Sequence, residues 1–154
     1  MKIVIMRHGE AETFAQSDAE RALTSFGRSA SRDVAQRCSL QGISQFDKVL
    51  VSPYLRAQQT WQELEDIFDA KEVSLSEDIT PYGDSAMVAD YLQALIELEQ
   101  PESVLLVSHL PLVGYLTADL VVDVAPPMFP TSGMICIEYD AQKQRGDILW
   151  NLKP

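Results

Sequence analysis

Residues 2–9, Lys-Ile-Val-Ile-Met-Arg-His-Gly, join a short apolar run directly to an arginine, a histidine and a glycine. A run of this length that ends in polar residues is typical of a strand buried on both faces. The same pattern recurs at residues 48–51, which lead into Ser52-Pro53, and at residues 103–107, which lead into Ser108-His109. Strands buried on both faces belong to parallel sheets. We therefore predict three parallel strands whose carboxyl ends carry polar side chains.

Helical patterns separate these strands. Thr24 is a predicted N-cap for a helix that runs to about residue 40, and further helices are expected at 55–68, 86–99 and 111–121. A short strand at 73–75 and two final strands at 134–139 and 147–152 complete the pattern. Strands that alternate with helices predict an α/β fold, a three-layer α/β/α sandwich with a mostly parallel central sheet. A chain of 154 residues is expected to form a single domain over residues 1–154.

The composition excludes several classes of partner. The formal net charge of −11 argues against nucleic acid and against an anionic membrane, since both require a cationic surface. The four apolar residues before Arg7 are too few for a signal peptide, and no longer apolar run could span a membrane. Cys38 and Cys136 are far apart and form no CxxC motif, so we expect two buried free thiols and a cytoplasmic protein.

Four reactive side chains follow the three predicted strands. Arg7 and His8 follow the first, Arg56 comes shortly after the second, and His109 follows the third. Ligands of open parallel sheets bind beyond the carboxyl ends of the strands. We therefore expect both histidines of this chain and two of its arginines to converge on one site.

These residue types suit a phosphoryl group. Arginine presents a planar fork of donors that matches phosphoryl oxygens, and two arginines can neutralise a transferring phosphoryl group. Neighbouring positive charge lowers the pKa of a histidine, which would keep His8 neutral and nucleophilic. Gly9 is expected to let the backbone approach a ligand, and helix N-termini near residues 55 and 111 would add N–H donors.

Other interpretations of these residues are possible. A lone histidine at a strand end is usually structural, and a lone arginine in a first helical turn is usually solvated. A metal site of two histidines and a carboxylate is an alternative, but the flanking arginines would repel a divalent cation. No dinucleotide or Walker motif is present. The joint occurrence of the four residues after separate strands favours the phosphoryl site.

The motifs also resemble a known family. Met6-Arg7-His8-Gly9, Leu23-Thr24 with Gly27, Ser52-Pro53 with Arg56, and Val107-Ser108-His109 resemble the histidine phosphatase (phosphoglycerate mutase-like) superfamily over nearly the whole chain. Residues 108–116 and Pro126-Pro127-Met128-Phe129 resemble more closely its short bacterial phosphohistidine phosphatases.

The resemblance implies a role for each site residue. His8 would be the nucleophile, Arg7 and Arg56 would bind the phosphoryl oxygens, and His109 would stabilise the transfer, with no metal and no cofactor. The implied partners are histidine-phosphorylated proteins, such as phosphotransfer domains of sensor kinases or phosphocarrier proteins.

The proton donor of the larger family members has no evident counterpart. Residues 80–84 lack their glutamate pattern, and Asp18 or Asp84 are the candidate substitutes. An imidazole leaving group needs an acid less than an alkoxide does, because its conjugate acid has a pKa of about 6.5. Phosphohistidine is therefore the favoured substrate. The alternatives are a small-molecule phosphomonoesterase of the same superfamily and a non-catalytic phosphoprotein-binding module.

Overall fold

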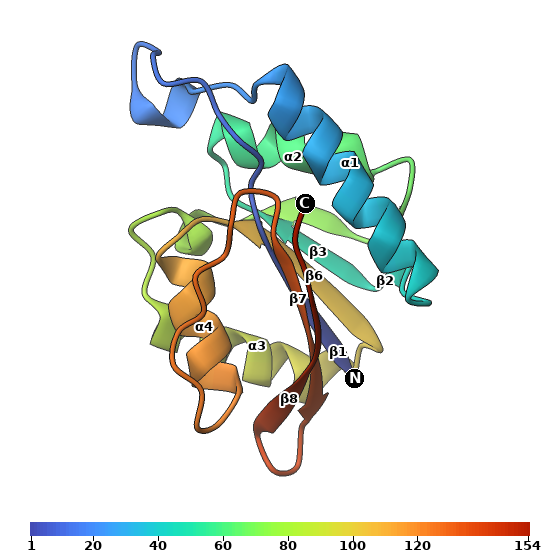
Figure 1. Ribbon diagram of the computed structural model, residues 1–154. Helices are drawn as coiled ribbons and strands as arrows, with labels where there is room; N and C mark the ends of the chain where they lie inside the picture. Colours follow the sequence, from blue (N-terminus) through green and yellow to red (C-terminus); the bar gives the residue numbers. More distant parts are fainter.

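The computed structural model describes residues 1–154. Its centre is a six-stranded sheet with the order β5-β3-β6-β1-β7-β8 (Figure 1). The strands are β1 (Lys2–Arg7), β3 (Lys48–Val51), β5 (Val73–Leu75), β6 (Ser103–Ser108), β7 (Met134–Asp140) and β8 (Arg145–Leu152). The first four strands of that order pair in parallel, whereas β1 with β7 and β7 with β8 pair antiparallel. The prediction of a mostly parallel sheet is confirmed.

The register of the three central strands brings their carboxyl ends to one level. Arg7 of β1 pairs with Ser108 of β6, and Val51 of β3 pairs with Val107 of β6. The chain therefore leaves the sheet at three neighbouring points. The first residues beyond the strands are His8, Ser52 and His109.

Two pairs of helices cover the two faces of the sheet (Figure 1). α1 (Ser25–Leu40) and α2 (Leu55–Leu64) lie on one face, and α3 (Ser85–Glu99) and α4 (Leu112–Leu120) lie on the other. Alternate residues of β1 serve the two layers, because Ile3 and Ile5 pack with α3 and α4 whereas Val4 and Met6 pack with α1 and α2. Each such buried side chain stabilises the fold by about 1.5–3 kcal/mol. The three-layer sandwich is thus confirmed.

The helix boundaries follow local chemistry. The Thr24 hydroxyl accepts a hydrogen bond from the backbone N–H of Gly27 and caps α1 as predicted. α2 ends at Leu64, four residues before the predicted end. Phe68 lies beyond that end, with its ring packed edge-on against Phe46 at 5.1 Å between centroids. This contact accompanies a two-stranded sheet, β2 (Gln45–Phe46) with β4 (Asp69–Ala70), that the sequence does not predict.

Both cysteines lie in the core between the sheet and α1. Cys38 and Cys136 are free and buried, and burial raises the pKa of their thiols to about 12 and about 11. Thiols with such pKa values carry almost no thiolate at neutral pH and are inert. The expectation of two buried free thiols is confirmed.

None of the helices combines the length and the apolar character that crossing a bilayer requires.

Candidate active site

The two histidines meet beyond the carboxyl ends of β1 and β6. Their ring centroids are 5.0 Å apart, and both side chains are buried. Arg56 lies in the first turn of α2 and reaches the same place, since its Nε donates a hydrogen bond to Nε2 of His8 over 3.3 Å. Arg7 precedes His8 in the chain. The predicted convergence of four side chains therefore exists in the structure.

The hydrogen bonds of His8 fix its tautomer. Nδ1 lies 2.7 Å from the carbonyl oxygen of Gly9, which can only accept, so Nδ1 carries the proton. Nε2 accepts from Arg56 and therefore holds the lone pair. A neutral imidazole in this tautomer presents a nucleophilic nitrogen directly beside a guanidinium.

The surroundings of His8 keep it neutral. Burial is the largest cause, and with the charges of Arg56 and Arg7 it lowers the pKa of His8 to about 4, against the hydrogen bond to Gly9, which raises it. The sequence predicts a lowered pKa from the arginines, and the structure shows that loss of water around the ring contributes more. At pH 7 almost every His8 ring is therefore in its neutral form.

The two arginines leave an excess of positive charge in the site. Arg7 donates from one terminal nitrogen to the carbonyl oxygen of Phe129 over 3.0 Å, while its buried Nε has no partner within the protein. Burial and then the charge of Arg56 lower the pKa of Arg7. Two neighbouring guanidiniums that repel each other gain from a shared anion, and a phosphoryl group provides the matching oxygens.

Asp18 is a carboxylate that contacts Arg56. It accepts a hydrogen bond from Arg56 over 3.1 Å through its side chain and another over 2.7 Å through its backbone oxygen. Hydrogen bonds from Arg21 and then Arg56 hold the pKa of Asp18 below its usual range. Asp84 instead caps α3 by accepting from the backbone N–H groups of Ala86 and Met87. Both candidate substitutes for a proton donor are thus held as acceptors in these contacts.

Ser52 orients the second histidine. Its Oγ lies 2.7 Å from Nε2 of His109 and accepts from the backbone N–H of Tyr54 over 3.3 Å. The hydroxyl hydrogen can donate to Nε2, and in that arrangement the imidazole proton lies on Nδ1. That Nδ1 is buried without a partner in the protein. Burial and then the charge of His8 hold the pKa of His109 far below its ordinary value.

Thr60 and α1 hold the loop that carries His8. The Thr60 hydroxyl accepts from the backbone N–H of Gly9 over 2.9 Å and donates to the carbonyl oxygen of Arg56 over 2.7 Å. A Cβ on Gly9 would lie 2.7 Å from the carbonyl oxygen of Gly27 and 2.8 Å from Oγ of Ser31. The close approach of α1 therefore requires glycine at position 9, a reason that the sequence does not reveal.

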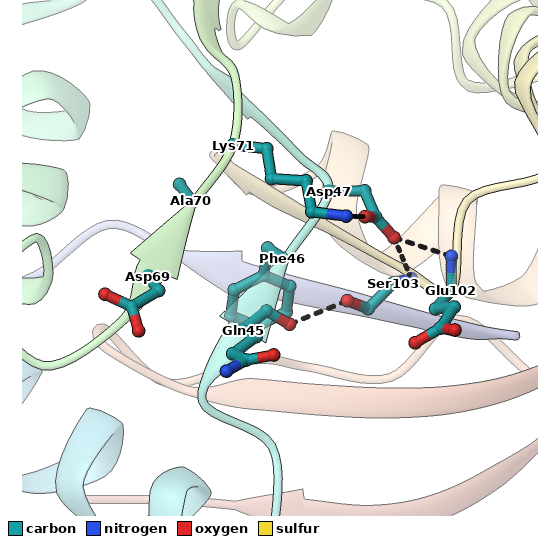
Figure 2. A pocket seen from close by; sticks show the side chains of 8 residues that line it. All are labelled: Gln45, Phe46, Asp47, Asp69, Ala70, Lys71, Glu102 and Ser103. Atoms are coloured by element: carbon teal, nitrogen blue, oxygen red, sulfur yellow. Dashed lines mark hydrogen bonds and ion pairs between the residues drawn. The ribbon is translucent and has the colours of Figure 1, made fainter.

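A hollow of about 290 Å³, drawn in Figure 2, lies at the other end of the sheet from the two histidines. The Asp47 carboxylate accepts from the backbone N–H groups of Glu102 and Ser103, over 2.6 and 3.2 Å, and pairs with Nζ of Lys71 at 2.8 Å. The Ser103 hydroxyl donates to the backbone oxygen of Gln45. These groups satisfy one another, and the other charged side chains that line the hollow, Asp69 and Glu102, are acidic. The hollow therefore offers no free cation to a phosphoryl group.

The sequence identifies the four central side chains but gives no role to three supporting groups: the Ser52 hydroxyl, the Thr60 hydroxyl and the carbonyl oxygen of Phe129. Ser52 lies 57 residues from His109, and a backbone carbonyl has no sequence signature. The signal for Ser52 is its position, because it follows β3 at the level where His8 follows β1. No group of three or more His, Cys, Asp or Glu side chains is arranged to hold a metal ion.

Comparisons with known proteins point to one family. The family model described as "Histidine phosphatase superfamily (branch 1)" matches residues 3–80. The chain is 42% identical to phosphohistidine phosphatase SixA of Escherichia coli (strain K12), over 100% of this chain and 94% of that protein. It is 45% identical to a SixA homolog of Haemophilus influenzae, over 78% of this chain and 77% of that protein. A solved structure of the protein histidine phosphatase SixA complexed with tungstate superposes with a TM-score of 0.94, at 42% identity, over 100% of this chain and 97% of that one.

Proposed function

Because this chain belongs to the histidine phosphatase superfamily, we propose that it is a phosphohistidine phosphatase. It removes the phosphoryl group from a histidine-phosphorylated protein through a phosphoryl intermediate on His8, within one catalytic domain over residues 1–154. The observation that carries the proposal is the neutral His8, whose Nε2 lone pair lies against Arg56. The resemblance read from the sequence motifs agrees with the family and with the relatives of this chain.

The first step is attack on phosphorus by Nε2 of His8. The bond between phosphorus and the substrate ring nitrogen breaks, and the substrate leaves as neutral imidazole when its other ring nitrogen carries a proton. Arg7 and Arg56 bind the equatorial oxygens, and Nδ1–H of His109 donates to one of them. Donors placed in advance around the developing charge supply most of the stabilisation in such transfers.

The second step is hydrolysis of the intermediate. Water attacks phosphorus, the bond to His8 breaks, and both protons of the water remain on the product, which leaves as dihydrogen phosphate. The carbonyl oxygen of Gly9 keeps the proton on Nδ1 of His8. His8 therefore leaves as a neutral imidazole, and this step also proceeds without a strong enzymic acid.

The lack of a proton donor favours a phosphohistidine substrate over a phosphate ester. An alkoxide leaving group requires an acid, whereas Asp18 is held ionised by Arg21 and Arg56 and Asp84 is engaged at the start of α3. The partners implied are phosphotransfer domains of sensor kinases or phosphocarrier proteins. The two inert thiols, Cys38 and Cys136, fit the reducing cytoplasm in which we place the enzyme.

Transfer of label tests the proposal. Incubation with a protein carrying radioactive phosphohistidine should give inorganic phosphate and, after rapid quenching, an acid-labile and base-stable label on His8. Faster turnover of sugar phosphates and glycerates than of the phosphoprotein would instead favour a phosphomonoesterase. Tight binding of the phosphoprotein with no labelled His8 and no released phosphate would favour a binding module.

A further inference from the structure

Three loops surround the candidate active site, and each exposes one large apolar side chain. These side chains are Phe14, Tyr82 and Met128, which are 91%, 83% and 81% exposed. Their loops comprise residues 9–24, 76–84 and 126–133, and all three lie at the end of the sheet where the central parallel strands finish (Figure 1). We call Phe14, Tyr82 and Met128 the apolar rim.

Each loop is attached to a residue of the site. The loop of Phe14 carries Asp18, which forms an ion pair with Arg56. Phe14 and Asp18 line the same hollow, of about 570 Å³. Met128 precedes Phe129, whose carbonyl oxygen accepts from Arg7.

The loop of Tyr82 is held next to His109. The carbonyl oxygen of Ile79 accepts from the Ser108 hydroxyl, and a Cβ on Gly83 would lie 3.2 Å from Leu112 of α4. The three loops are therefore held in place before a substrate arrives, which reduces the entropy lost on binding.

The fold gains little from the apolar rim. Side chains exposed to this extent bury little area, so they contribute little to stability. Exposed aromatic and methionine side chains around a polar site are typical of protein interfaces. Leu40 and Leu98 are equally exposed, at 86% and 84%, but lie at the carboxyl ends of α1 and α3, so they serve as matched controls.

The charge around the apolar rim is strongly negative. Residues 9–24, 76–84 and 126–133 contain seven Asp or Glu residues and one basic residue, Arg21. Arg21 is already paired with Asp18. A free phosphorylated metabolite meets this acidic border before it meets Arg7 and Arg56, whereas a protein with Lys or Arg around its phosphohistidine is attracted to it.

We propose that the apolar rim and its acidic loops form a docking surface for a folded protein whose phosphohistidine is surrounded by basic and apolar side chains. This inference rests on the proposed function and adds the kind of surface that the partner presents. The basic side chains of the partner meet the acidic loops, and its apolar side chains cover the three rim residues. Its phosphoryl group then reaches Arg7 and Arg56.

Two substrates with the same phosphorus–nitrogen bond test this surface. One is a phosphocarrier protein phosphorylated on a histidine that has Lys or Arg neighbours. The other is phosphoramidate, a molecule too small to contact the apolar rim. The triple variant Phe14→Ala, Tyr82→Ala, Met128→Ala should lower kcat/KM for the phosphoprotein about 30-fold and change that for phosphoramidate less than about twofold. The control variants Leu40→Ala and Leu98→Ala should behave as wild type on both.

The charge is tested separately. Glu12→Gln with Asp78→Asn should lower kcat/KM for the phosphoprotein about threefold at low salt and flatten its dependence on ionic strength. Glu97→Gln, a change on α3, should have no such effect.

The outcomes separate this inference from the proposed function. Unchanged turnover of the phosphoprotein by the triple variant, or equal losses on both substrates, would overturn the docking surface alone. Hydrolysis of phosphoramidate by the wild type with none of the phosphoprotein would overturn the docking surface and the protein substrate, but would keep the phosphatase chemistry of His8. Hydrolysis of neither substrate would overturn the proposed function as well.

Discussion

The two ends of the central sheet differ in how their charged side chains are paired. At the amino ends of the strands, Asp47 is neutralised by Lys71 and by two backbone N–H groups. At the carboxyl ends, Arg7 has one protein acceptor and a buried Nε without a partner, and Arg56 shares the carboxylate of Asp18 with Arg21. Lys71 at the amino end is paired with a carboxylate, whereas the two guanidiniums at the centre of the carboxyl end keep donors free for an anion.

This difference identifies the functional end better than shape does. Both ends are hollowed, but a hollow whose polar groups satisfy one another contributes to stability and offers nothing to an anion. Burying unpaired polar groups costs free energy, and an anion that pairs with Nε of Arg7 and Nδ1 of His109 would recover that cost. The comparison predicts that changes at the carboxyl end lower the rate, whereas changes at the amino end lower only stability.

The largest expected effect is that of His8→Ala. Without Nε2 no phosphoryl intermediate forms, so kcat on a phosphohistidine protein should fall by at least about ten-thousandfold. The fold should survive, because the side chain of His8 makes only two hydrogen bonds, to Arg56 and to the Gly9 carbonyl oxygen, and belongs to neither apolar core cluster. Activity and the thermal midpoint of unfolding are measured together. A variant that kept most of its activity would refute the nucleophile.

Arg56→Ala should have the second-largest effect on the rate. Removing one guanidinium from the phosphoryl group should cost about 3 kcal/mol of transition-state stabilisation, a fall in kcat/KM of about a hundredfold or more. Lys71→Ala removes a cation at the amino end and is the matched control, for which kcat/KM should be unchanged. Equal losses in the two variants would erase the contrast between the ends.

Acid should destabilise the protein through its histidines. The folded pKa of His8 is about 4, against about 6.5 in an unfolded chain, so between these values the unfolded state binds the proton and the folded state does not. Stability is therefore unaffected above pH 6.5 and falls as the pH drops toward 4, by about 3 kcal/mol from His8 alone.

Urea unfolding of wild type and His8→Asn between pH 4 and 7 measures this contribution as the change in their stability difference with pH. The chain has only two histidines, so the imidazole NMR signals can be assigned directly. Titration of the His8 ring near pH 6.5 would show that the carboxyl end is wetter and less cationic than the structure indicates.

Ser52→Ala should have a smaller effect on the rate. Loss of the hydroxyl frees His109 to exchange tautomers, so kcat should fall about tenfold, the effect of one neutral hydrogen bond of about 1.4 kcal/mol. A nitrogen-15 spectrum supplies a second measurement that a merely structural role would not change. It should show the proton of His109 on Nδ1 in the wild type and a mixture of tautomers in the variant. An unchanged spectrum would remove the positioning role of Ser52.

The contrast between the ends also explains what the sequence could predict. The strands β1, β3 and β6 and the four reactive side chains can be recognised in the sequence. Each of these strands is a short apolar run that ends at polar residues, and this pattern is visible within a few neighbouring residues. The two-residue strands β2 and β4 are too short to show a period, and the early end of α2 depends on the packing of Phe68 against Phe46. The role of Gly9 depends on the close approach of Gly27, a contact with a distant helix that composition alone does not reveal.

The smallest expected effect belongs to the amino end. Lys71 is 82% exposed, so water and salt screen its ion pair with Asp47, and Lys71→Met should leave the free energy of unfolding almost unchanged. Asp47→Ala should cost more, about 1–2 kcal/mol, because it also strands the backbone N–H groups of Glu102 and Ser103. Denaturant unfolding separates the two variants, and both should keep the wild-type kcat/KM on a phosphohistidine protein. A variant with a lower kcat/KM but an unchanged free energy of unfolding would contradict this prediction. The paired charges at the amino end of the sheet would then contribute to the reaction and not only to stability.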